Sequence, residues 1–178
     1  MLSRNILASV GLSTMALCLS ARSAIAAPVC AVNNDFAEIM PQLLSDLPSY
    51  SNRVIQRARK LEREEDTYSH VLEAGGADFQ PLALKQQQFT PQAEDTTEQV
   101  FFATLDRQYI NDAVVTLEQH HWLFVTPSSG GWSVVHLLSA ANTENNETLI
   151  IPPRISTSGS VGKAIQLWLR DYNAYCAN

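Results

Sequence analysis

Three long runs that alternate apolar and polar residues constrain the fold of this chain more than any other feature. They are EQVFFATLDRQY, AVVTLEQHHWLFV and WSVVHLLSA, at residues 98–109, 113–125 and 132–140. A period of two residues is typical of β-strands that bury one face. Asn111-Asp112 and Ser129-Gly130 lie between the runs and supply turn residues, so the pattern predicts an antiparallel meander.

Two shorter strand-like runs precede the meander. YSHVLEA and FQPLAL, at residues 68–74 and 79–84, flank Gly75-Gly76. A glycine pair between two such runs predicts a hairpin, and Pro81 marks an edge strand or a break. The sequence therefore predicts about five antiparallel strands.

Helical patterns lie on both sides of the strands. Apolar spacing of three or four residues predicts a helix from its cap Asp35 to Pro48, which ends it, and a second helix from about Tyr50 to Glu65. A C-terminal helix completes the chain. Because helices and strands are segregated along the sequence, we expect one α+β domain, with the helices packed on the sheet.

The stretch SGSVGKAIQLWL, residues 158–169, begins the C-terminal helix and contains a Gly-Lys pair. A phosphate-binding loop of the Walker type needs a glycine where this chain has Thr157 and a hydroxyl where it has Ala164. We therefore interpret the stretch as the start of a helix that Ser158 or Ser160 caps.

The first 26 residues have a basic start, a short apolar core and the small-residue end Ala24-Ile25-Ala26. This pattern predicts a secretory signal peptide cleaved after Ala26, which leaves residues 27–178 as the single domain. Residues 1–178 carry 12 basic and 18 acidic residues, for a net charge of −6. An acidic domain argues against nucleic acid as a partner. The residues directly before the cysteines do not form a lipid-attachment site, and no later apolar stretch is long enough for a transmembrane helix. The sequence therefore predicts no membrane anchor.

Cleavage would leave two cysteines, Cys30 and Cys176. One pair in an oxidising compartment predicts a disulfide between the mature N-terminus and the end of the last helix. Two unpaired thiols are the alternative, and the spacing excludes a CxxC redox site.

Four blocks carry a resemblance to a known family: LLSDLPSYSNRVIQRAR, FFATLDRQY, QHHWLFVTPSSGGWSVV and GSVGKAIQLWLRDYNAYC. Together they resemble a family of exported cyanobacterial proteins. The resemblance implies an address, the periplasm or the thylakoid lumen, and brings no activity, cofactor or catalytic residue with it.

Asp106, His121 and His136 are the candidate polar site. Turns centred on 111–112 and 129–130 would place them on one sheet face, with Thr104 and Gln119. Two histidines and a carboxylate suggest a metal or acid–base site. Hydrogen-bonded core histidines are the interpretation we favour, so we assign no catalytic residue, metal ligand or cofactor.

The basic residues Arg53, Arg57 and Lys60 share one face of the predicted second helix. A solvated helix with internal ion pairs is favoured over a docking patch for an acidic partner protein, because Glu62, Glu64 and other acids follow directly.

The opposite sheet face is expected to carry Phe101, Trp122, Phe124 and Leu137. Few helices are available to cover two faces, so one apolar face is expected to be open to a protein partner, to self-association or to a small apolar ligand. The leading hypothesis is therefore a non-enzymatic binding or accessory module. The alternative is a small enzyme or metal-binding protein that uses Asp106, His121 and His136.

Overall fold

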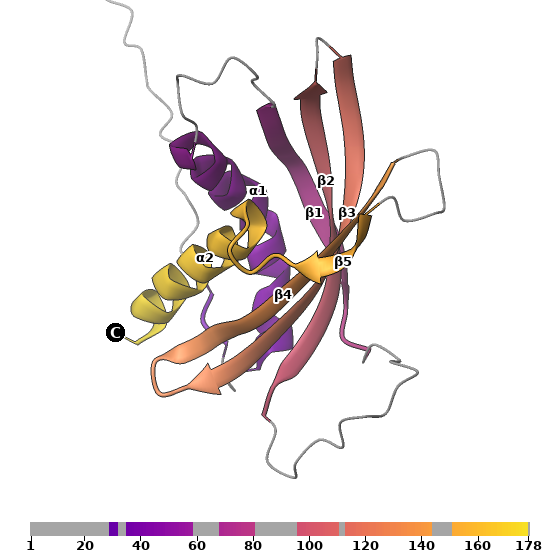
Figure 1. Ribbon diagram of the computed structural model, residues 1–178. Helices are drawn as coiled ribbons and strands as arrows, with labels where there is room; N and C mark the ends of the chain where they lie inside the picture. Colours follow the sequence, from indigo (N-terminus) through magenta and orange to yellow (C-terminus); the bar gives the residue numbers. More distant parts are fainter. Residues whose placement is uncertain are drawn as a thin grey trace, which may run out of the picture.

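Five strands form one sheet in the computed structural model, which describes residues 29–31, 35–58, 68–80, 96–110, 113–143 and 151–177. Every neighbouring pair is antiparallel, and the strands lie in chain order (Figure 1). They are β1 (Tyr68–Asp78), β2 (Glu98–Ile110), β3 (Ala113–Ser128), β4 (Gly131–Thr143) and β5 (Ile151–Ile155). The predicted α+β class and antiparallel meander are confirmed.

The hairpin expected at Gly75-Gly76 is wrong, because β1 continues through both glycines to Asp78. Strand β2 offers partners along this whole length, and the chain changes register twice against it instead of turning back. Gly76, with φ of 71°, lies within the second of these irregularities. Residues 81–84 of the expected second strand lie outside the described residues.

Strand β5 is the fifth strand and was not anticipated from the sequence. It is five residues long, contains Pro152-Pro153 and pairs only with β4. Proline has no N–H to donate to a ladder, and the pair is tolerated here because β5 is an edge strand with a neighbour on one side.

In the described part of the chain one helix precedes the sheet, where two were expected, because α1 runs through the position at which the first was to end. Helix α1 (Phe36–Ala58) contains both Pro41 and Pro48. Its buried stripe is continuous across the two prolines, from Phe36 through Leu43 and Leu47 to Ser51. Burial of this stripe outweighs the hydrogen bonds that the prolines remove. Residues 59–65 of the expected second helix lie outside the described residues.

The start of helix α2 (Ser160–Cys176) differs from the expected capped turn. Gly159 is the N-cap residue, and no side chain caps the helix there. The glycine that matters is Gly162, because a Cβ at this position would lie 2.4 Å from the carbonyl oxygen of Thr157. The entry turn therefore folds back onto the first helical turn at a distance that only glycine allows.

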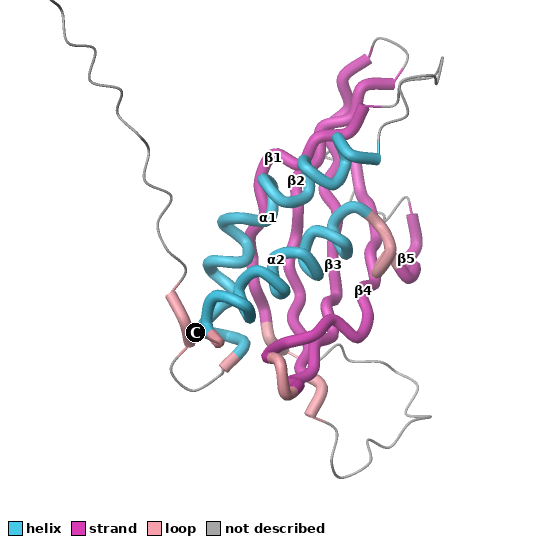
Figure 2. Tube along the Cα trace, turned by 90° about the vertical axis from the view of Figure 1, so that its left-hand side faces the viewer, coloured by secondary structure: helices cyan, strands magenta, loops and turns pink. Residues whose placement is uncertain are grey.

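Both helices lie on the same face of the sheet (Figure 2), which we call the inner face. The core forms between them and includes Leu43 and Leu47 of α1, Ile165 and Trp168 of α2, and Phe102, Leu123 and Leu137 of the sheet. We call the other side of the sheet the outer face. In the described part of the chain no helix covers it (Figures 1 and 2).

An asparagine on each helix binds the backbone of a strand near an edge of the sheet. Asn52 of α1 accepts from the N–H of Val71 at 2.9 Å and donates to its carbonyl at 2.8 Å. Asn173 of α2 does the same with Trp132 of β4, at 3.2 Å and 2.9 Å. Each amide thus replaces a neighbouring strand, and the two asparagines fix the helices against β1 and β4.

Gly131 makes the second of these contacts feasible. Its φ is 103°, and a Cβ there would lie 2.2 Å from Oδ1 of Asn173. The turn between β3 and β4 therefore requires glycine both for its backbone conformation and for the approach of the asparagine.

The expected disulfide joins Cys30 and Cys176, which are 146 positions apart in sequence and whose Cα atoms are 5.7 Å apart. Next to it the N–H of Ala31 donates to the hydroxyl of Tyr172 at 2.8 Å. The segment before α1 is therefore attached to the end of α2. Neither α1 nor α2 combines the length and apolar character of a membrane-spanning helix.

Replacing both Cys30 and Cys176 by serine should lower the free energy of unfolding by about 4–5 kcal/mol, because the bond closes a loop of most of the chain. Urea unfolding of the oxidised wild type and the double variant measures the difference. Equal midpoints would contradict a structural role for the bond.

Asn173→Ala should expose the N–H of Trp132 to hydrogen exchange and destabilise the fold by roughly 1–3 kcal/mol, since a partly buried backbone pair loses both partners. Asn52→Ala should act on Val71 and leave Trp132 protected. Exchange measured residue by residue separates the two, and unchanged protection at both amides would refute the edge contacts.

Candidate functional site

A chain of hydrogen-bonded side chains crosses the inner face beneath the helices. The hydroxyl of Thr104 donates to Asp106 at 3.1 Å and lies 3.0 Å from Nε2 of His121. Nδ1 of His121 lies 2.7 Å from the hydroxyl of Ser139. Gln119 extends the chain beyond Asp106, and Ser156 extends it beyond Ser139. The register predicted between β2 and β3, with Phe102 opposite His121 and Thr104 opposite Gln119, is confirmed.

The central members of this chain are closed off from solvent. The exposed fraction is 1% for His121 and 3% for Asp106. The imidazole also stacks on Phe102, with ring centroids 4.8 Å apart. A substrate has no access to either group in this arrangement.

Burial moves the two pKa values in opposite directions. It raises the pKa of Asp106 from 3.8 to about 6, against hydrogen bonds from Thr104 and Gln119 that lower it. It lowers the pKa of His121 from 6.5 to about 3, and the charge of neighbouring His120 adds to the lowering. His121 is therefore neutral at neutral pH, and acidification protonates Asp106 first.

The hydrogen bonds are satisfied in either state of Asp106. With Asp106 ionised, Thr104 donates to it and accepts the Nε2 proton of His121, while Nδ1 accepts from Ser139. With Asp106 protonated, every one of these bonds can reverse, and the last donor, Ser156, points at the carbonyl of Leu137 at 3.4 Å. The chain thus accommodates one proton without leaving a buried group unpaired.

His136 does not belong to this chain, contrary to the expected register. The register between β3 and β4 shifts after the pair Val125–Val134, and the next pair is Phe124–His136. Val135 is the extra residue of this bulge, so every later residue of β4 faces the side opposite to that expected. His136 is exposed on the outer face, and His121 lies opposite Ser139.

The same bulge moves Leu137 from the outer face, where it was expected, to the inner face. Leu137 pairs with Leu123 and is fully buried in the core. Leu138 takes the outer position opposite Trp122. Among the residues that the structure describes, no group of three or more His, Cys, Asp or Glu side chains is arranged to hold a metal ion.

The outer face carries the other predicted residues, Phe101, Trp122 and Phe124. The ring centroids of Phe101 and Trp122 are 5.5 Å apart, and the two rings are tilted by 56°. The imidazole of His120 also stacks on Phe101, with ring centroids 5.8 Å apart. Phe124 lies two residues further along β3, on the same face. All three predicted aromatic residues are half-buried and form one cluster with Leu138, which we call the aromatic patch.

A pocket between the two helices was not anticipated. It has a volume of about 560 Å³ and is lined by Val54, Arg57, Ala58, Lys163, Gln166, Leu167 and Arg170. Its two halves come from residues more than a hundred positions apart, so sequence spacing could not reveal it. The available signals were Arg57 in the basic row and Lys163 in the SGSVGK stretch.

Asp106 and His121 make opposing contributions to the pH dependence of the free energy of unfolding. The stability contributed by Asp106 is present below 3.8, its unfolded pKa, and is lost as pH rises through about 6. The stability contributed by His121 is present above 6.5 and is lost as pH falls toward about 3. Between pH 3.8 and about 6 both groups respond, and their opposite effects on the free energy of unfolding nearly cancel in the wild type.

Asp106→Asn should remove this cancellation and keep both partners bonded, since the amide oxygen can accept from Gln119 and the amide NH2 can donate to Thr104, as a protonated Asp106 does. Relative to wild type, its free energy of unfolding should fall by roughly 1.4 kcal/mol for each pH unit below about 6, since only His121 then responds. His121→Gln should give the opposite slope. Urea unfolding at a series of pH values tests both, and curves parallel to the wild type would contradict the assignment.

Comparison of the chain with protein-family models, with curated proteins and with solved structures gives no significant match. The resemblance to exported cyanobacterial proteins therefore stays a prediction, and the function is argued from the geometry described above.

Proposed function

We propose that this protein is a non-enzymatic binding module whose outer sheet face docks a protein partner. The observation that carries the proposal is the one-sided packing of the helices, which leaves the aromatic patch uncovered by any described segment (Figures 1 and 2). A sheet face of this kind behaves as an interface rather than as core.

The composition of the outer face fits a protein interface. Half-buried aromatic side chains occupy its centre, and exposed apolar ones surround them, with Val135 39% and Ile155 70% exposed. Aromatic residues at the centre of a patch contribute most of the binding energy in protein complexes. Beside the patch the outer face is hollowed by a pocket of about 460 Å³ that Glu73, Leu105 and Glu118 help to line, and an apolar side chain of a protein partner could enter it.

Two polar atoms on this face support an interaction there. Nε2 of Gln99 and Nδ1 of His120 are buried and have no hydrogen-bond partner in the described part of the chain. Gln99 lies opposite Phe124, and His120 stacks on Phe101, so both belong to the aromatic patch. Because both atoms are closed to solvent, a partner could bind them only after the Gln99 or His120 side chain turns outward, and that exchange would remove the cost of leaving them unpaired.

The rim of the patch indicates the charge of the partner. Glu73 and Glu118 flank Leu105 on the outer face, and Arg107 follows further along β2. The whole chain has a net charge of −6. These charges favour a partner with an apolar centre and a basic rim over a second copy of the chain.

Recognition through the sides of the sheet is less favourable. Asn52 and Asn173 already bind backbone groups of Val71 and Trp132 there. Asn52 lies at the β1 edge and Asn173 at the edge formed by β4 and β5, where β5 itself is short and contains two prolines. Addition of a strand from a partner needs free backbone groups, so the face is the better docking surface.

The alternative enzyme or metal site has lost its geometric support. His136 lies on the outer face, while Asp106 and His121 are enclosed on the inner face. The disulfide between Cys30 and Cys176 supports an oxidising compartment, in agreement with the proposed export to a periplasm or thylakoid lumen.

Site-specific photo-crosslinking in the native host tests the docking face. With benzoylphenylalanine in place of Val135, we expect an adduct with one protein of different mass. Ser45, exposed on α1, is the matched control position and should give none. Ile155→Lys should reduce the adduct at least roughly tenfold, because it places a positive charge against the basic rim of the partner without disturbing the core.

Trp122→Ala should abolish the adduct as well, with folding checked by the protection of buried amides. Equal adducts from Ser45 and Val135, or an adduct with the mass of two copies of this chain, would overturn the proposal.

A further inference from the structure

We propose that the pocket between α1 and α2 is a second binding site, for a single-chain amphiphile with an anionic carboxylate head. The site lies on the helical side of the molecule and does not depend on the outer face. Its volume of about 560 Å³ is within the usual range for small-ligand pockets.

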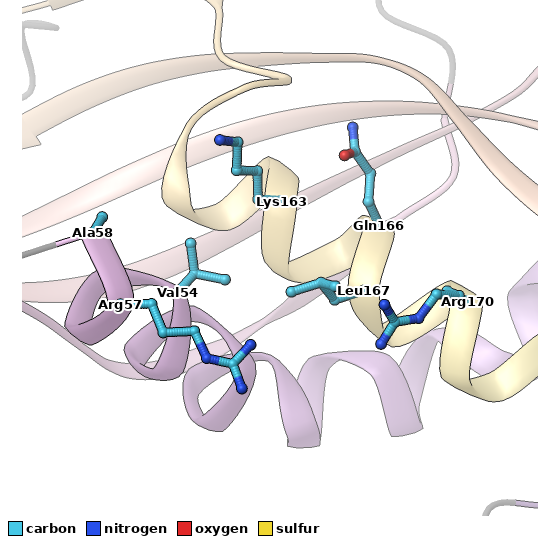
Figure 3. A pocket seen from close by; sticks show the side chains of 7 residues that line it. All are labelled: Val54, Arg57, Ala58, Lys163, Gln166, Leu167 and Arg170. Carbon is cyan, nitrogen blue, oxygen red and sulfur yellow. The ribbon is translucent and has the colours of Figure 1, made fainter.

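The floor of this pocket is apolar. Val54 of α1 and Leu167 of α2 point toward one another across it (Figure 3). Both are half-buried, although they lie on helices whose inner stripes are packed against the sheet. An alkyl chain placed between them would remove further apolar surface from water.

Cationic side chains border this floor on both sides. In Figure 3 Arg57 and Arg170 lie at opposite ends of this floor, to either side of the Leu167 side chain, and Lys163 and Gln166 extend from α2 away from the two arginines. Neither Arg57 nor Lys163 forms an ion pair with any residue that the structure describes. Three cations around an apolar floor, in a chain of net charge −6, make this pocket complementary to an anionic ligand.

The arginines suit a carboxylate head in particular. Arg170 binds Asp171 through Nε and Nη2, at 3.0 Å and 2.7 Å, which fixes its guanidinium. Its remaining N–H groups, and those of Arg57, have no partner among the residues that the structure describes, and a guanidinium carries five donors. Planar donors of this kind bind carboxylates in a bidentate manner.

Titration of the purified mature protein with laurate, below its micelle concentration and followed by methyl NMR, tests the proposal. We expect saturable shifts at Val54 and Leu167. Dodecyltrimethylammonium has the same chain with a cationic head, and acetate has the same head without the chain. Neither should bind measurably, because the site needs both parts of the ligand.

Arg57→Gln should weaken laurate binding about tenfold, the loss expected for one charge-assisted contact. Arg154→Gln is the matched control, since Arg154 is also exposed but lies on β5. Leu167→Gln should weaken binding through the chain instead of the head.

Equal binding of laurate and dodecyltrimethylammonium, or an unchanged affinity of Arg57→Gln, would overturn the proposal. Shifts confined to Trp122 and its neighbours would also overturn it and assign the ligand to the outer face. Binding of an acidic amphipathic peptide without binding of laurate would identify the pocket as a protein-docking site and refute the amphiphile. None of these outcomes depends on whether the outer face binds a partner.

Discussion

The packing of both helices on one face of the sheet is the constraint on which the rest of this structure depends. Each helix is fixed to the sheet by an asparagine amide, Asn52 against Val71 and Asn173 against Trp132. The two helices are joined in turn by the indole of Trp168, which donates to Asp46 at 2.8 Å. The disulfide attaches the segment before α1 to the end of α2. These contacts leave the outer face as the part of the sheet that no described helix covers.

One-sided packing explains why the polar residues of the two faces differ in character. On the inner face Asp106, Thr104, His121 and Ser139 are buried, and each satisfies its neighbour. Such a network costs desolvation energy and contributes to the specificity of the core when every member is paired. On the outer face His120 and Gln99 keep unpaired atoms beside aromatic rings. The first set is fully paired, and the second is not paired within the described part of the chain.

The sequence predicted the meander well where alternation was unambiguous. The register of β2 on β3 followed from one turn and an uninterrupted pattern, so Thr104, Asp106, Gln119 and His121 were correctly placed on one face. The register of β3 on β4 failed by one residue. Val134-Val135 and Leu137-Leu138 are apolar pairs that fit either face, so no pattern could reveal the bulge that moved His136 and Leu137.

Other failures came from tertiary packing that overrides local rules. Pro48 predicted the end of a helix, but the buried stripe of α1 continues to Ser51. Gly75-Gly76 predicted a turn, but the long partner strand β2 keeps β1 extended. The pocket between α1 and α2 was inaccessible to sequence reasoning because it joins Arg57 to Lys163, Leu167 and Arg170. Local signals therefore predicted the elements, and the contacts between distant elements determined the candidate sites.

The central claim, one covered and one open sheet face, is tested most directly by the three tryptophans of the chain. Trp132 and Trp168 are each 3% exposed in the core, while Trp122 lies in the aromatic patch. Fluorine NMR of protein labelled with 5-fluorotryptophan, with a soluble gadolinium chelate added, reports the access of solvent to each ring. The account predicts strong broadening of the Trp122 resonance and little change in the other two. Equal protection of all three would contradict it, because the outer face would then be covered.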